Sequence, residues 1–229
     1  MNIIVISLER AQERLERMKK QLADRNIEAV IYSCFDTNDI KNPTFGGNIH
    51  LPGGFRHGDK MRGGEYCCTI SHITALQIAK TMKWEHVIIL EDDIIIAEDF
   101  EKRINHLFKI LPANWEHVYL SGIPRYKGYH HKLNIVQIVL SDSEDMIRVD
   151  GTCSYMVKNV AYDKMIKKLM SLQTTPDDMI NHFIFQEKLL KSYIYFPFVT
   201  YVDDGKYSYI GNDRNEIMHL SKDYYVEKL

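Results

Sequence analysis

The sequence predicts a single α/β domain spanning residues 1–229, with a mostly parallel central sheet flanked by helices. First, the β-branched run Ile3–Ile6 indicates a buried strand, and an amphipathic segment and a second apolar run follow it. This order is the β-α-β start of a parallel sheet. Second, 229 residues with 45% apolar and 26% charged side chains suit one large globular domain.

The N-terminal half alternates strands with helices. Segment 9–26 has mixed charge and apolar residues at helical spacing, which predicts an amphipathic helix, and segment 28–36 predicts the next strand. Segment 65–83 repeats the helical periodicity, and Val87–Leu90 follows it as a short buried strand.

The C-terminal half continues this alternation less regularly. In order, we expect a helix at 99–110, strands at 117–122 and 151–158, and helices at 160–172 and 176–192. Pro176 near the start of the last helix suits its first turn. Residues 123–150 alternate short strand candidates with polar loops.

Residues 41–64 interrupt the pattern with a long, glycine-rich segment, which holds seven of the twelve glycines of the chain. A long loop in a compact domain is usually functional or mobile. The segment also carries the cations Lys41, Arg56, Lys60 and Arg62. It predicts either a surface insertion or a flexible lid over an anionic substrate.

Charge and cysteine content narrow the class of partner and the compartment. The net charge of −2 provides no strong field for nucleic acid, so no nucleic-acid partner is expected. The four cysteines include no C-x-x-C pair, which favours reduced thiols in a cytoplasmic protein. No stretch approaches the roughly 20 apolar residues of a membrane span. Peripheral contact with the inner face of a membrane remains open.

Three consecutive carboxylates, Glu91, Asp92 and Asp93, lie between two apolar runs in "WEHVIILEDDIIIAEDF". Burying an ionised carboxylate costs several kcal/mol unless it is compensated. The triplet follows a predicted buried strand, where ligands bind in open α/β sheets. A divalent cation, Mn²⁺ or Mg²⁺, that carries a diphosphate would compensate the charge. The alternative is a turn whose acids simply face water.

The motifs of the chain resemble glycosyltransferase family 25, the lipooligosaccharide galactosyltransferases and their relatives. Four stretches carry the likeness in the order of the family: "SLERAQERLERM" (7–18), "GEYCCTISH" (64–72), "VIILEDDI" (87–94) and "GTCSYMVK" (151–158). A looser match is "TPDDM", with Pro176 and Asp178 in register. The chain departs from the family pattern at Ser7, Cys67 and Cys153.

The resemblance implies a GT-A-like fold and an inverting transfer of a sugar, galactose above all, from a UDP-sugar to an oligosaccharide or glycolipid acceptor. Asp93, helped by Glu91 or Asp92, is the expected metal ligand. The expected donor-binding residues are Ser7, Leu8, Arg10, Arg14, Asp36, Glu65, His72 and Asp92.

An inverting transfer also needs a general base. Asp178 is the candidate, and Glu91 is a second candidate catalytic carboxylate. Asp178 has an alternative role, because acids in a first helical turn also complement the helix dipole.

Two other functional classes fit parts of the pattern. A metal-dependent nucleotidyltransferase or phosphotransferase also needs carboxylates at a strand end. A catalytically inactive module that binds a nucleotide or a glycan is the second alternative.

Overall fold

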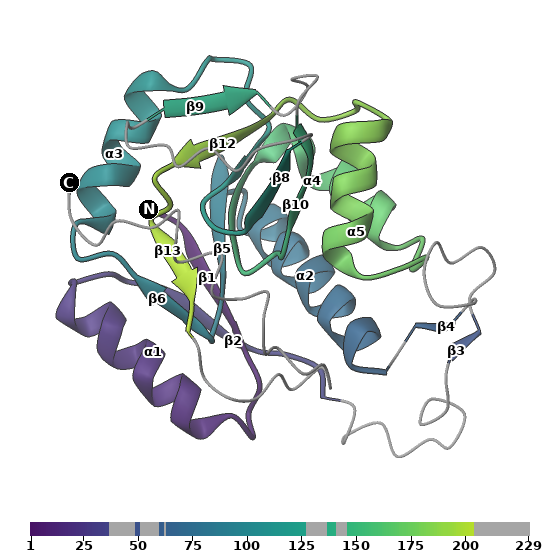
Figure 1. Cartoon of the computed structure of the whole chain (residues 1–229). Helices are drawn as coiled ribbons and strands as arrows, with labels where there is room; N and C mark the ends of the chain where they lie inside the picture. Colours follow the sequence, from purple (N-terminus) through teal and green to yellow (C-terminus); the bar gives the residue numbers. More distant parts are fainter. Residues whose placement is uncertain (37–48, 51–59, 62, 127–136, 141–145, 204–229) are drawn as a thin grey trace.

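The computed structural model describes residues 1–36, 49–50, 60–61, 63–126, 137–140 and 146–203. A seven-stranded sheet forms its centre, in the order β2-β1-β5-β11-β7-β12-β9 (Figure 1). The strands are β1 (Ile3–Ser7), β2 (Val30–Ser33), β5 (His86–Glu91), β7 (His117–Tyr119), β9 (Gln137–Leu140), β11 (Ser154–Lys158) and β12 (Ser192–Phe196). Only β11 and β9 run against the other five, so the predicted α/β class with a mostly parallel sheet is confirmed.

Helices cover both faces of this sheet. On one face lie α1 (Gln12–Asp24) and α3 (Phe100–Ile110), and on the other lie α2 (Gly63–Thr81), α4 (Asn159–Leu169) and α5 (Pro176–Asn181) (Figure 1). The alternation of side chains along a strand explains the two layers. Ile4 and Ile6 of β1 pack with residues of α2, whereas Ile3 and Val5 pack with residues of α1 and α3.

Among the described residues, three antiparallel strand pairs lie outside the central sheet. They are β3 (Ile49–His50) with β4 (Lys60–Met61), β6 (Ile94–Ile96) with β13 (Thr200–Val202), and β8 (Ile123–Tyr126) with β10 (Met146–Asp150). The pair β6–β13 matters for the site, because β6 directly follows the acidic triplet. Buried Gln21 of α1 donates to the carbonyl of Ile94 at 2.9 Å and accepts from the amide of Ile96 at 2.8 Å.

The helix predicted at 176–192 extends only to Gln186 in the structure. The helix α5 ends at Asn181 and continues as one turn of π-helix, η1 (His182–Gln186), and Ser192 already belongs to β12. The apolar residues of 176–192 have helical spacing. The stretch "SYIYF" (192–196) begins at the last residue of that segment and is fully buried as a strand of the central sheet. Strands β6, β12 and β13 were not predicted, because their pairing is non-local.

The glycine-rich segment is described only in part. Residues 41–48, 51–59 and 62 lie outside the described residues, and with them most of the predicted lid. Helix α2 begins at Gly63, two residues earlier than predicted. Among the described helices, none combines the length and the apolar character needed to cross a membrane.

Candidate active site

A pocket opens beside the carboxyl ends of β1, β2 and β5, at the edge of the sheet where the sequence predicted a ligand site. It contains about 590 Å³ of empty space, part of it continuous with solvent. The start of α2 forms its opposite wall. The predicted site residues that line it are Leu8, Arg10, Arg14, Asp36, His72, Glu91, Asp92 and Asp93.

Arg14 and Ser7 compensate the two buried aspartates of the triplet. Asp92 and Asp93 are 6% and 3% exposed. The guanidinium Nη1 of Arg14 lies 3.5 Å from Asp92 Oδ1 and 3.4 Å from Asp93 Oδ2. Ser7 at the end of β1 donates a hydrogen bond of 2.7 Å to Asp92 Oδ2. The helix α1 therefore provides the positive charge of Arg14 beside the acids that follow β5.

This compensation is incomplete. Burial raises the pKa of Asp92 to about 6, while the hydrogen bond from Ser7 and the charge of Arg14 limit the rise. Four carboxylates and two guanidinium groups line the pocket, so its charge is −2 with the acids ionised and His72 neutral. The pocket as a whole therefore attracts a cation and repels an anion.

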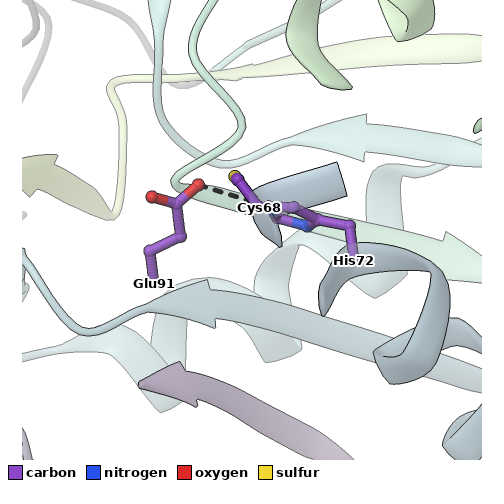
Figure 2. Close-up of side chains that lie close together, drawn as sticks. All are labelled: Cys68, His72 and Glu91. Carbon is purple, nitrogen blue, oxygen red and sulfur yellow. Dashed lines mark ion pairs between the residues drawn. The ribbon is translucent and has the colours of Figure 1, made fainter. Parts of the chain in front are cut away.

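Glu91 also belongs to a second group of side chains, together with Cys68 and His72 (Figure 2). Glu91 Oε1 lies 3.3 Å from His72 Nε2 and accepts a hydrogen bond of 3.2 Å from Thr152 Oγ1. The ligand atoms of Cys68, His72 and Glu91 all lie within 4.8 Å of one another. Burial raises the pKa of Cys68 well above its usual value, and the charge of Glu91 adds to the rise.

Arg10 and Asp36 form an ion pair at the wall made by the segments that follow β1 and β2. Between β2 and Asp36, the side chain of Phe35 lines the pocket and remains 49% exposed. Burial raises the pKa of the neighbouring Cys34 to about 12, so this thiol stays protonated at neutral pH. This wall therefore combines an aromatic face with a charged pair.

Three predicted residues do not line the pocket. Ser7 is buried behind Asp92, and Glu65 lies in the first turn of α2, next to the lining residue Gly64. Asp178 lies at the start of α5, where its Oδ1 is 3.6 Å from Arg148 Nη1 and its Oδ2 accepts from Thr174 at 3.4 Å.

The neighbouring Asp177 has an electrostatic effect on a residue that lines the pocket. Asp177 Oδ2 accepts from the amide of Gly151 at 3.3 Å. The charge of Asp177 also contributes to the raised pKa of Cys68, which lines the pocket. The structure thus assigns the two acids of "TPDDM" to different neighbours.

Sequence reasoning gave no site role to Cys68, which lines the pocket, or to Thr152 and Tyr155, which contact the lining residues Glu91 and His72. A signal existed for Cys68, because it precedes His72 by four residues on a predicted helix. Tyr155 hydrogen-bonds His72 Nδ1 at 2.9 Å, and Thr152 contacts Glu91. Both belong to "GTCSYMVK", whose side-chain partners depend on the pairing of β11 with β5.

Comparison with known proteins places these motifs in context. The family model described as glycosyltransferase family 25 (LPS biosynthesis protein) matches residues 1–180. Procollagen galactosyltransferase 2 of Homo sapiens is 26% identical over 125 residues, 52% of this chain and 20% of that protein. The probable inactive glycosyltransferase 25 family member 3 of Bos taurus is 28% identical over 127 residues, 52% of this chain and 21% of that protein. The chain matches about a fifth of the length of these relatives.

Solved structures of glycosyltransferases are also similar to this chain at 9% identity. A glycosyltransferase involved in the glycosylation of the major capsid of PBCV-1 has a TM-score of 0.48, covering 84% of this chain and 80% of that one. GlyE of Streptococcus pneumoniae TIGR4 has a TM-score of 0.45, covering 84% and 44%.

Proposed function

The chain belongs to glycosyltransferase family 25, and on this premise we propose that it transfers a sugar from a UDP-sugar to a saccharide acceptor. Galactose is the proposed sugar, because a matched relative is a procollagen galactosyltransferase. The proposed acceptor is an oligosaccharide or a glycolipid. We place the reaction in the cytoplasm or at the inner face of the membrane.

One observation supports this proposal most strongly: the acidic triplet lines a pocket at the carboxyl ends of β1 and β5, together with two arginines. In open α/β sheets, this edge is where nucleotides bind. The pocket charge of −2 suits a divalent cation together with a diphosphate, whereas it would repel a diphosphate alone. A surface turn with solvated acids would lack both the burial and the cavity.

The donor set fits a hard divalent cation, Mn²⁺ or Mg²⁺. Asp93, with Asp92 or Glu91, would hold it through carboxylate oxygens, the ligands that such ions prefer. When bound, the ion supplies Lewis-acid neutralisation of the charge on the leaving diphosphate. Arg14 already neutralises part of the acidic charge at 3.4–3.5 Å, so the ion joins an incompletely balanced site.

The chain's own residues bind and orient the donor. Arg14 holds the two aspartates in place, and Ser7 fixes the rotation of Asp92 through its hydrogen bond. Arg10, which pairs with Asp36, lines the pocket wall, and in our proposal its guanidinium also contacts phosphate oxygens of the donor. Asp36, held by Arg10, is placed to accept from ribose or uracil, and Leu8 adds apolar contact.

His72 and Glu65 complete the proposed donor site from α2. They are seven residues apart on this helix and share a face, so one donor can contact both.

The proposed base must take a proton from the acceptor hydroxyl. Asp178 keeps this role in our proposal, with Glu91 as the second candidate. Asp178 now lies beside Arg148 and outside the pocket lining, so it acts only on an acceptor that reaches the start of α5. Glu91 lines the pocket itself. Comparing Asp178→Asn with Glu91→Gln for transfer and for donor hydrolysis separates the two.

A second candidate function is an inactive nucleotide- or glycan-binding module, because some matched family members are named inactive. The acidic triplet and Arg14 argue for activity, since a module without catalysis does not need a cation site. The third candidate, a nucleotidyltransferase or phosphotransferase, uses the same carboxylates with a nucleoside triphosphate.

A donor panel tests the proposal. Purified protein is incubated with UDP- and GDP-sugars and with nucleoside triphosphates, in Mn²⁺ or in chelator, and released nucleotide is measured. We expect release from UDP-galactose that requires Mn²⁺. Turnover of triphosphates alone supports the phosphotransferase, and UDP binding without turnover supports the inactive module. Either outcome rejects our proposal.

A further inference from the structure

We propose that Cys68, His72 and Glu91 form a second cation site, suited to Zn²⁺, with an open coordination position toward the pocket. All three side chains line the pocket, and Glu91 is also the first residue of the acidic triplet. The inference does not rest on the proposed glycosyl transfer, because it follows from the ligand geometry alone. It shares one residue, Glu91, with the proposed Mn²⁺ or Mg²⁺ site.

The backbone brings the three ligands together from two elements. Cys68 and His72 are four residues apart on α2, so their side chains lie one turn apart on the same helix face. Glu91 is the last residue of β5, against which α2 packs. Figure 2 shows the three side chains converging, with the thiol and the carboxylate near the imidazole.

The distance between the imidazole and the carboxylate matches an edge of a tetrahedral zinc site. With Zn–N and Zn–O bonds of about 2.0–2.2 Å, a tetrahedral N···O edge is about 3.4 Å, and the longer Zn–S bond makes the S···N edge about 3.6 Å. The observed separation of His72 Nε2 and Glu91 Oε1 is 3.3 Å. The Cys68 sulfur lies within 4.8 Å of both, so each of its two distances must shorten by at most about 1.2 Å to complete the site.

The imidazole of His72 provides a second, independent observation. His72 is fully buried, and its Nε2 has no hydrogen bond, although the carboxylate of Glu91 lies beside it. Its Nδ1 is held by Tyr155 at 2.9 Å. A metal selects the tautomer in which Nδ1 donates to Tyr155, because the lone pair of Nε2 then faces the carboxylate of Glu91 and a cation between them binds both.

The outer contacts also resemble those of a metal site. Ligating histidines usually have their second nitrogen fixed by a hydrogen bond, and ligating carboxylates accept from neighbours. Tyr155 fixes the second nitrogen of His72 by a hydrogen bond, and Thr152 donates a hydrogen bond to Glu91. Binding would release the thiol proton of Cys68 to solvent. The thiolate and the carboxylate then balance the double charge of the ion.

The ligand types select the metal. Sulfur and imidazole favour Zn²⁺ over Mg²⁺ or Mn²⁺, which prefer oxygen. Three protein ligands leave a fourth position for water or a ligand, as in zinc sites that do chemistry. The all-oxygen set of Asp92 and Asp93 has the opposite preference, so the two cations are distinguishable by ion competition.

Cobalt spectroscopy tests this site without any sugar donor. Co²⁺ bound by a thiolate has a sulfur-to-metal charge-transfer band in the near ultraviolet. We expect wild-type protein to develop this band, saturating at one Co²⁺ per chain. Zn²⁺ should abolish the band, whereas excess Mg²⁺ should not. Cys68→Ser should remove the band and weaken Zn²⁺ binding more than about 10-fold.

Three matched variants make the result specific. Cys67→Ser changes the adjacent cysteine, which is outside the ligand cluster, and should keep the band. Asp93→Asn should also keep it, because it removes only the proposed oxygen-ligand site. Glu91→Gln should weaken Zn²⁺ binding, and it should reduce the rise in the midpoint of thermal unfolding that Zn²⁺ causes in the wild type.

The inference is overturned if wild-type protein develops no charge-transfer band, or if Cys68→Ser keeps it. It is also overturned if Zn²⁺ leaves the midpoint of wild-type unfolding unchanged, since a ligand that binds only the folded state must raise it. Transfer activity does not decide the matter. Mn²⁺-dependent turnover without a cobalt band rejects this site alone, and a band without turnover rejects only the proposed function.

Discussion

Replacing Arg14 with methionine removes the only guanidinium that contacts both buried aspartates among the described ion pairs. Methionine keeps much of the apolar volume of the side chain and deletes the charge. Arg14 is 16% exposed, and the side chains of Asp92 and Asp93 are 8% and 5% exposed, so solvent screens these pairs poorly. We expect Arg14→Met to fold with lower stability.

The magnitude follows from the two distances. At 3.4–3.5 Å, with an effective dielectric constant near 20, each pair contributes a gross attraction of about 5 kcal/mol, which desolvation largely offsets. Breaking a buried pair by removing one partner costs about 3–5 kcal/mol. The lower end applies here, because Asp92, with a pKa of about 6, takes up a proton at modest cost. We predict a loss of about 3 kcal/mol, or roughly 6–12 °C in the unfolding midpoint.

Urea and thermal unfolding, with and without Mn²⁺, provide the assay. Mn²⁺ should stabilise Arg14→Met more than the wild type, because the ion then binds the aspartates without repulsion from a guanidinium. Arg17→Met is the matched control. Arg17 lies on α1, as Arg14 does, and it pairs with Asp203, but this ion pair is more exposed to solvent. We expect the control to lose about 1 kcal/mol or less. A loss below about 1 kcal/mol in Arg14→Met, or equal stabilisation by Mn²⁺ in both proteins, would refute the reasoning.

Two further predictions concern groups outside the pocket. Burial lowers the pKa of His117 to about 3, so this imidazole stays neutral in the fold but gains a proton near pH 6.5 when unfolded. Stability should therefore fall as pH drops below about 6.5, by about 2 kcal/mol at pH 5 from this group alone. In urea unfolding, the free energy of unfolding of His117→Gln should fall between neutral pH and pH 5 by about 2 kcal/mol less than that of the wild type. An equal fall in both proteins would contradict the lowered pKa of His117. Gly122 has φ of +135°, and a Cβ there would lie 2.5 Å from Val149 Cγ1, so Gly122→Ala should cost more than about 2 kcal/mol. Gly151→Ala, with φ of +90° and its nearest contact at 3.9 Å, is the control and should cost about 1 kcal/mol; equal losses would show that the clash is not decisive.

Local patterns explain why much of the fold was predictable. The runs around β1 and β5 and the helical spacing in α1 and α2 are properties of neighbouring residues, and the ends of all four elements lie within three residues of the predicted ones. Strands β12 and β13 were missed because their local sequence does not identify them. Only pairing with β7 and β6, far away in sequence, identifies these segments as strands.

The candidate site was predictable to a similar extent. The acidic triplet and Arg14 were identified, but the direct contact between them was not, because it joins residues 79 positions apart. The cluster of Cys68, His72 and Glu91 depends on the packing of α2 against β5, and the sequence indicates only the helical half of it. Asp178 shows the limit of motif matching, since its neighbour Asp177 has the electrostatic link to the pocket.

The central claim is that the acidic pocket holds a divalent cation together with the diphosphate of a UDP-sugar. Asp93→Asn tests it most directly, since it removes one carboxylate charge from the pocket with little change in shape. UDP release from UDP-galactose should require Mn²⁺ in the wild type and be abolished in Asp93→Asn, with Mn²⁺-dependent UDP binding weakened in parallel. Turnover that is equal in both proteins, or that persists in chelator, would contradict the claim.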